Sequence, residues 1–418
     1  MKTESKAVIA VYIISSVLIL HMVTGALLTY IFKAYGATVD TNTIILVMTL
    51  PSLVGIVGTI AAGPLAMVLN KKMMLLVCAG LLFAYFAMLA LVGPNGPFWV
   101  LLLAAVFAGI CQGGSVTLTS LIIGEFSPPE KRAPRMARSG AIMNIGAAVI
   151  NIVGGMIASG NDGADWPKAY YLGVIIIPAM ILFFILMPSK SPAVPTEAEH
   201  VAAEAAAGTP PSTARTLIRV VLMDLAIMLA AVAYAAFILN VSTHIVDVYA
   251  LGDSSHAGIA NAISTVAGVA AGFTLPIWIK LFKNWLVVVG YAVIALGLVF
   301  MGAMTTSLVG IFICGALVGF GLNMASPYAI SVIMGVTPAK FVPIAVSLFI
   351  GAINLGIFLA PYIHKVISMP FGGGHAGMVW SSATLAAVVA VASIFLYVTL
   401  KKPSAPAPSA SEPSPVAA

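Results

Sequence analysis

The chain has 418 residues, of which 61% are hydrophobic and only 8% are charged, and its formal net charge is +6 with a sequence pI near 9.2. A mean hydropathy of +1.11 excludes a soluble globular domain, because a soluble fold could not bury so much apolar surface. The composition predicts an all-α integral membrane protein with almost no residues left for a soluble catalytic domain.

Twelve apolar stretches follow one another along the chain, each bounded by charged residues or by proline and glycine. A hydrocarbon core of about 30 Å needs a helix of about 20 residues, so each stretch predicts one transmembrane helix. The first six are 7–32, 43–69, 73–92, 98–124, 137–158 and 168–187. The second six are 216–243, 257–279, 285–304, 307–335, 343–368 and 378–400. The first is too long for a signal-peptide core and lacks a small-residue cleavage site, so we interpret it as a retained helix.

Two stretches of low complexity divide the chain. Residues 189–215 are rich in Ala, Pro and Glu and too polar to span a bilayer, and the tail after Lys402 is rich in Pro, Ser and Ala. We therefore predict an N-terminal six-helix bundle over 1–188, a cytoplasmic linker over 189–215, a C-terminal six-helix bundle over 216–402 and a disordered cytoplasmic tail over 403–418.

The distribution of lysine and arginine predicts the orientation, since basic loops stay in the cytoplasm. With both termini inside, only Lys33, Lys168 and Lys365 of the 19 basic residues fall on the outer side. The positive charge then reflects topology and contact with anionic lipid, and nucleic-acid binding is the weaker interpretation. We expect a multi-pass protein of the plasma or inner cell membrane.

Each half of the chain carries the same two markers. Gly63 precedes the basic turn after the second span, and Gly272 precedes the basic turn after the eighth span, 209 residues later. Pro128 in FSPPEKR corresponds to Pro338 in VTPAKF, 210 residues later. Two markers at nearly one spacing predict a duplication, and its repeats are parallel because each marker follows the same-numbered span of its half.

With these features the chain resembles the major facilitator superfamily over nearly its whole length. The family's loop after span 2 reads about Gly-x-x-x-Asp-Arg-x-Gly-Arg-Lys; here Gly63, Lys71 and Lys72 match, while Met67 stands in the place of the Asp. The loop after span 4, with Pro128, is similar to the family's Phe-Pro-x-x-x-Arg segment. The resemblance implies two six-helix bundles around a central cavity that spans 1, 4, 7 and 10 line. Residues typical of the family's drug antiporters are only partly present.

In many members of the family the loop Asp helps to hold one state of an inner gate, so its absence calls for another carboxylate. Glu125, next to Lys131 and Arg132 at the inner end of span 4, is the candidate, with Lys71 and Lys72 as further gating residues. The alternative is that Glu125 only lies in the headgroup region beside cations.

Polar residues at mid-bilayer depth point to a pathway, because leaving them in lipid costs a few kcal/mol each. His21 lies near the middle of span 1 and either bonds a neighbouring group or acts as a substrate contact or protonation switch. Gln112, Tyr234 and Asn323 lie near the centres of spans 4, 7 and 10, and we expect them to line the cavity. Ser115 and Ser326 are expected to serve helix packing.

Few charges enter the predicted spans. Asp224, about one turn beyond Arg219 in span 7, is either a carboxylate that exchanges a proton or a counter-ion of the inner gate. His364 and Lys365 lie toward the outer end of span 11. Lys365 either extends to the interface or forms a cationic vestibule for an anionic substrate.

No phosphate-binding or dinucleotide-binding motif is present, and the three cysteines are isolated within spans, so we predict no enzyme activity, no cofactor and no metal site. No carboxylate lies deep in the first six spans, which favours a small neutral or anionic organic solute over a cationic drug. We interpret the chain as a monomeric secondary carrier that uses protons or exchange. A proton-coupled drug or metabolite efflux antiporter is the alternative, and a non-transporting membrane receptor the remote one.

Overall fold

The structure is a computed structural model of the 418-residue chain. It describes residues 3–93, 96–158, 165–188, 213–241, 243–251, 254–338 and 341–398. These residues form helices joined by short turns, with no β-strand among them. The predicted linker lies outside the described residues except for its last three, which belong to a helix, and the predicted tail over 403–418 lies outside them entirely.

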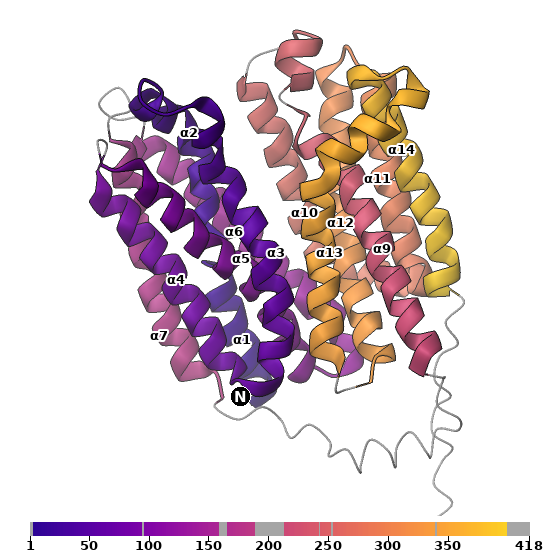
Figure 1. Ribbon diagram of the computed structural model, residues 1–418. Helices are drawn as coiled ribbons and strands as arrows, with labels where there is room; N and C mark the ends of the chain where they lie inside the picture. Colours follow the sequence, from indigo (N-terminus) through magenta and orange to yellow (C-terminus); the bar gives the residue numbers. More distant parts are fainter. Residues whose placement is uncertain are drawn as a thin grey trace, which may run out of the picture.

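The elements of the first half of the chain form six crossings of the molecule, coloured indigo to magenta in Figure 1. The first crossing is interrupted and the sixth changes from a 3₁₀ to an α-helix. The elements are α1 (Thr3–Ser15), η1 (Leu20–Met22), α2 (Val23–Tyr35), α3 (Thr41–Val68), α4 (Lys71–Val92), α5 (Phe98–Glu125), α6 (Pro129–Ala158), η3 (Trp166–Ile175) and α7 (Ile176–Leu186).

The second half repeats this pattern with six more crossings. Its first two are joined through a π-helical turn, η4, and its last ends in a second π-helical turn, η8. The elements are α9 (Thr213–Ile238), η4 (Thr243–Val248), α10 (Ser254–Phe282), η5 (Lys283–Trp285), α11 (Leu286–Ala303), α12 (Leu308–Val336), α13 (Val342–Ile367), η7 (Met369–Phe371), α14 (Gly374–Ser393) and η8 (Ile394–Val398).

Length and composition pick out 11 helical stretches able to cross a membrane. One of them, Gly258–Ala303, is 46 residues long and contains both α10 and α11, which η5 separates. The predicted all-α fold with twelve spans is therefore confirmed. The fifth span differs from its predicted start at 137, because α6 already begins at Pro129, a residue suited to the first turn of a helix. Lys131, Arg132 and Arg135, which precede the predicted start of the fifth span, thus lie on the first turns of α6.

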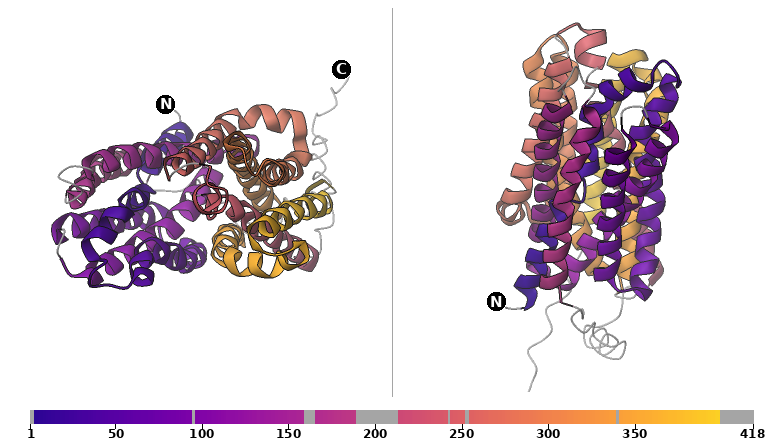
Figure 2. Two further views of the ribbon diagram at one scale, coloured as in Figure 1. Left: turned by 90° about the horizontal axis from the view of Figure 1, so that it is seen from above. Right: turned by 90° about the vertical axis from the view of Figure 1, so that its left-hand side faces the viewer.

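The two halves stand side by side, as the view from above shows (Figure 2). We call the end of the helices at which α7 ends and α9 begins the linker end, and the other the opposite end. Between the halves, α3 packs on α13 and α10 packs on α6. The halves meet near the linker end and diverge toward the opposite end (Figure 1).

Glycine allows the close approach at the linker end. A Cβ added to Gly63 of α3 would lie 2.6 Å from the carbonyl oxygen of Pro343 on α13, and one added to Gly272 of α10 would lie 2.7 Å from that of Ala137 on α6. Side chains cannot occupy such positions, so both helix pairs depend on a missing Cβ. Gly63 and Gly272 are the first pair of repeat markers. The duplication seen in the sequence therefore places an equivalent glycine at each of the two contacts between the halves.

Replacing Gly272 by Leu should force α10 away from α6 and open the linker end. The reporter is Ser347→Cys on α13, fully buried at the Gly63 contact, in a protein whose native cysteines are replaced by Ala. We expect labelling of this cysteine by a water-soluble maleimide to rise at least about tenfold, which corresponds to roughly 1.4 kcal/mol.

Gly258→Leu on the same helix is the control, because a Cβ there meets no atom within 4 Å. Equal labelling in the Gly272→Leu and Gly258→Leu proteins would show that the glycine contact does not close this end.

Candidate functional site

The first crossing is interrupted near its middle, where a continuous helix was predicted. Between α1 and α2 the backbone bonds shorten to 3₁₀ type, with the amide of Leu20 donating to Val17 O and that of Met22 to Ile19 O. This segment contains neither Pro nor Gly, but the Ser16 hydroxyl at its start donates to Ile13 O at 2.8 Å, a contact that bends helices. Its backbone lies against α6, where a Cβ on Gly146 would come within 3.0 Å of the carbonyl carbon of Ser16.

Side chains from other helices satisfy carbonyl groups at the break. The Cys111 thiol of α5 donates to Leu18 O at 3.7 Å, and the Tyr85 hydroxyl of α4 donates to His21 O at 3.4 Å. Irregular backbone at membrane depth persists only where such partners or a cavity supply its hydrogen bonds. Interrupted helices of this kind are also where carriers build their binding sites.

His21 and Gln112, two residues predicted to line the pathway, meet at this break. His21 Nε2 lies 3.2 Å from Gln112 Oε1, and the His21 side chain is 7% exposed. An amide oxygen only accepts, so Nε2 carries the proton and Nδ1 presents a lone pair. Nδ1 is buried and has no hydrogen-bond partner in the part of the chain that the structure describes. A buried acceptor of this kind can receive a hydrogen bond from a ligand or take up a proton.

A group of hydroxyls fixes the backbone behind His21. Thr24 Oγ1 bonds the Tyr85 hydroxyl and lies 3.0 Å from the Tyr170 hydroxyl, and all three side chains are buried. The rings of Tyr85 and Tyr170 pack edge to face with centroids 5.8 Å apart. These residues were missed in the sequence. The available signal was that Thr24 follows His21 by three residues and so lies on the same side of a helix.

The other predicted lining residues lie in the second half. Tyr234 of α9 hydrogen-bonds Ser264 of α10. Asn323 of α12 donates to Gly319 O at 2.9 Å, and its side chain fills the space beside Gly268 of α10. The contacts of Tyr234 with Ser264 and of Asn323 with Gly268 hold α10 against α9 and α12, so they are packing contacts within one half.

One polar contact joins the halves above the linker-end glycines. Asn354 Nδ2 of α13 donates to Thr59 Oγ1 of α3 at 3.4 Å. The sequence alone does not indicate which face of the helix Asn354 occupies. Thr59 is fully buried.

Lys365 lies apart from the residues at the break. It is exposed near the end of α13, whereas the neighbouring His364 is buried and bonds Val232 O of α9 at 2.9 Å. His364 thus fastens α13 to α9, whereas the Lys365 side chain is exposed on the surface of the protein. This placement fits a lysine that extends to the interface.

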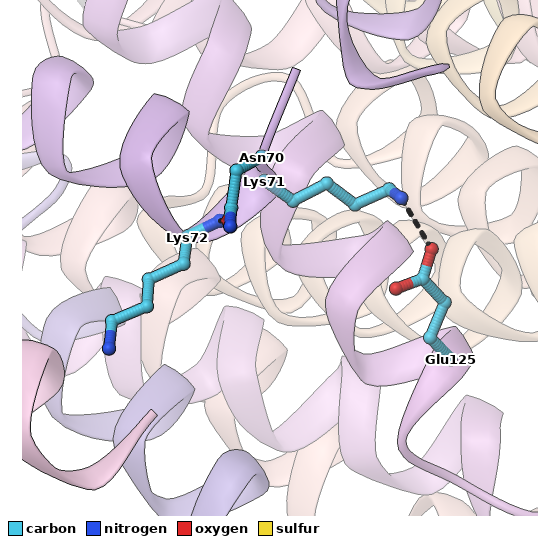
Figure 3. A network of polar contacts seen from close by, with 4 residues as sticks. All are labelled: Asn70, Lys71, Lys72 and Glu125. Atoms are coloured by element: carbon cyan, nitrogen blue, oxygen red, sulfur yellow. Dashed lines mark hydrogen bonds and ion pairs between the residues drawn. The ribbon is translucent and has the colours of Figure 1, made fainter. Parts of the chain in front are cut away.

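At the linker end, Glu125 pairs with Lys71, one of the lysines that the sequence predicted to take part in gating (Figure 3). Lys71 Nζ lies 2.7 Å from Glu125 Oε1, with the side chains 17% and 23% exposed. Arg132 donates to Ser127 O in the turn after α5. The Lys71–Glu125 pair joins the start of α4 to the end of α5, next to the contact of Gly124 with α12 of the other half.

Lys72 and Asn70 complete the turn drawn in Figure 3. The Asn70 side chain caps α4 by accepting from the amide of Lys72 at 2.9 Å. The buried amine of Lys72 donates to Met187 O at 2.7 Å and lies 4.4 Å from the centre of the Phe184 ring. Lys72 therefore fastens the end of α7 to α4, which is a contact within the first half.

Asp224 and Arg219 both approach the π-helical end of the last crossing. Arg219 donates to Phe395 O of η8 at 3.1 Å. Asp224 Oδ1 is buried without a hydrogen-bond partner among the described residues, near the buried Tyr397 of η8. This places the carboxylate between α9 and η8 inside the second half. Its predicted roles in coupling or gating stay predictions.

Comparison with known proteins agrees with this architecture. The sequence model of the family described as Major Facilitator Superfamily matches residues 9–254, more than half of the chain. The MFS-type transporter gkaD of Penicillium citrinum is 28% identical over 113 residues. That stretch is 27% of this chain and only 18% of the fungal protein.

Two solved structures illustrate the shared fold. The fucose:proton symporter FucP of E. coli superposes with a TM-score of 0.67 at 16% identity, over 93% of this chain and 98% of that one. The human organic anion transporter MFSD10 (TETRAN) superposes with a TM-score of 0.69 at 14% identity, over 95% of this chain and all of that one. At such identities the likeness concerns the fold alone.

Tyr85→Phe should lower the free energy of unfolding by about 1 kcal/mol, because His21 O loses a donor and Thr24 loses one of its partners. Thermal unfolding of the purified protein in detergent measures this. Tyr171→Phe, at a side chain that is 62% exposed, is the control and should change stability by less than about 0.5 kcal/mol. Equal effects of the two substitutions would contradict a structural role of the hydroxyl group at the break.

Lys71→Met and Glu125→Gln should be coupled in a double-mutant cycle of unfolding free energies, by about 1 kcal/mol for a partly buried pair. The matched comparison is the pair of Lys168 and Asp165, 2.9 Å apart with Lys168 60% exposed. Its cycle, with Lys168→Met and Asp165→Asn, should give about 0.5 kcal/mol or less. Additive effects at Lys71 and Glu125 would show that their contact contributes nothing to stability.

Proposed function

Because the chain belongs to the major facilitator superfamily of transporters, we propose that it is a secondary carrier for a small organic solute, anionic or neutral. It works by alternating access and is driven by a proton gradient or by exchange of solutes.

The observation that carries the proposal is the unpartnered Nδ1 of His21 beside Gln112 at the interrupted first crossing. In its neutral form this nitrogen accepts a hydrogen bond from a hydroxyl or amide of a solute. In its protonated form the imidazolium attracts an anion. Gln112 adds an amide that can turn to bond the same solute. His21 thus supplies both solute recognition and a site for a coupled proton.

The charges of the first half support a neutral or anionic solute. The carboxylate side chains that the structure describes in this half lie at or near helix ends, away from His21: Asp40, Glu125, Glu130 and Asp165. A cationic solute at the break would therefore meet no nearby counter-charge among the described side chains of this half. The fold itself accommodates both favoured classes, since it is shared with a fucose:proton symporter and an organic anion transporter.

The arrangement of the halves supports alternating access. Contacts through Gly63 and Gly272 bring the halves together at the linker end, while the halves diverge toward the opposite end. This is the geometry of a carrier whose site is reached from the opposite end. The reverse movement would separate the glycine contacts and bring the opposite ends together.

Efflux of a cationic drug or metabolite in exchange for protons is the second candidate. The observation that favours it is Asp224, a carboxylate with a buried oxygen that has no hydrogen-bond partner among the described residues. Such a group binds a proton readily, because leaving it charged and unpaired in an apolar environment is costly. Its position between α9 and η8 is the reason to rank it second.

The proposed location is the plasma or inner membrane, with a monomer as the working unit and both termini in the cytoplasm. Lys71, Lys72, Lys131, Arg132 and Lys280 all lie near the linker end. Basic residues of short loops stay on the cytoplasmic side, so the linker end is the cytoplasmic one. The opposite end then faces outward.

The proposal is tested by uptake into proteoliposomes of labelled organic anions, neutral solutes and cationic drugs, with and without a pH gradient. We expect an anion or neutral solute to accumulate, and His21→Ala to reduce its uptake at least about tenfold, the loss of roughly 1.4 kcal/mol of binding. His256→Ala, at a histidine near the start of α10, is the control and should keep normal uptake. Movement of cationic drugs alone, or full uptake by the His21→Ala protein, would overturn the assignment.

A further inference from the structure

Two histidines meet at the opposite end of the second half, away from the break in the first crossing. His244 lies on η4, the turn between α9 and α10, and His375 lies on the first turn of α14. His244 Nδ1 is 2.7 Å from His375 Nε2, and His244 Nε2 is 3.3 Å from the carbonyl oxygen of Thr305. Three connections of the second half therefore converge on His244.

The partners decide where the protons lie. The Thr305 carbonyl only accepts, so His244 Nε2 carries a hydrogen and Nδ1 of the neutral ring is an acceptor. His375 Nε2 must then donate to it. If His244 takes up a proton on Nδ1, the contact survives only when His375 Nε2 is the acceptor. The pair can thus accommodate one added proton, whereas a second would set two N–H groups against each other.

The surroundings keep this pair tight. His244 is fully buried, its ring centre lies 4.6 Å from that of Tyr249, and the two imidazole centres are 4.8 Å apart. His375 is only partly buried, so protons can reach the pair through it. Among the side chains that the structure describes, the titratable groups in contact with His244 are His375 on α14 and Tyr249 after η4, and the turn between α11 and α12 contributes the carbonyl of Thr305.

We propose that His244 and His375 form a proton-binding latch that holds the α9–α10 connection against the start of α14 and releases it when both rings are protonated. The latch belongs to the second half alone. Because η4 joins α9 to α10, release frees the ends of both helices. Of these, α10 packs on α6 of the first half, and α9 packs on α13, which itself packs on α3 of the first half. A low pH at the opposite end would thereby loosen the second half on the side where the two halves diverge.

The titration of His244 supports this direction. Burial, and next the charge of a protonated His375, lower the pKa of His244 to about 4, against the pull of the Thr305 hydrogen bond. A released histidine has an ordinary pKa of about 6.5 and binds more protons at intermediate pH than the latched one. The latch is therefore fully favoured above about pH 6.5 and is lost as the pH falls from there toward 4.

The test is hydrogen–deuterium exchange of the full-length protein in lipid nanodiscs at pH 7.5 and 5.0, corrected for the intrinsic exchange rates. Amides of residues 243–251 should lose protection at least about tenfold at pH 5.0, which corresponds to roughly 1.4 kcal/mol of opening. In His375→Gln the loss of protection should be clearly smaller, because the Gln amide donates to neutral His244 and accepts from the protonated ring without titrating, and only burial then opposes protonation of His244. Protection independent of pH in the unmodified protein would overturn the proposal.

The matched control is His256→Gln on α10, which should behave as the unmodified protein does. If His256→Gln also removed the pH dependence of amide protection, the His244–His375 latch would not be the source of that dependence. Should His375→Gln fail to fold, ¹⁵N NMR of labelled histidine in the unmodified protein tests the same idea. The ring signal that disappears in His244→Gln should stay neutral with its proton on Nε2 down to about pH 5, and titration of that signal near 6.5 would contradict the latch.

Discussion

Close approach of helices without intervening side chains governs how the two halves of this protein meet. Gly63 and Gly272 bring α3 to α13 and α10 to α6 at distances that no Cβ would permit. Glycine and alanine present little apolar area, so such contacts gain from van der Waals packing and their separation exposes little surface. The closed linker end thus has a well-defined geometry, although closing it buries little surface between the two halves. A carrier needs this balance, because moving a two-state equilibrium from 1:99 to 99:1 takes a differential affinity of about 5.5 kcal/mol.

The candidate site depends on a different kind of packing, in which polar groups repair an interrupted helix. Cys111 and Tyr85 bond the carbonyl groups of Leu18 and His21, and Gln112 bonds the imidazole itself. The first half therefore forms a rigid frame around His21, with one ring nitrogen left over. The polar residues predicted in the second half, Tyr234 and Asn323, instead support packing of α10. The two halves share a fold and differ in what they place at mid-depth.

Much of the fold was predictable from the sequence because the bilayer imposes strong rules on span length and backbone satisfaction. The twelve spans and the pairing of Gly63 with Gly272 follow from hydropathy and spacing. The partners that hold the break before His21 were not predictable, since Gly146, Cys111 and Tyr85 lie on other helices far away in the sequence. Lys71 and Glu125 were both predicted as gating residues, but their contact was not, because Lys71 begins α4 and Glu125 ends α5 and the two lie far apart in the sequence.

The break also has a consequence for biosynthesis. The side chains that bond its carbonyl groups belong to α4 and α5, which follow the first crossing by some sixty to ninety residues. When the first crossing leaves the ribosome, none of these partners exists. A regular helix satisfies its own backbone in lipid, so the first crossing enters the membrane most favourably as an unbroken helix. Its interruption at Val17–Met22 is then a late event of assembly, completed when α4, α5 and α6 close around it.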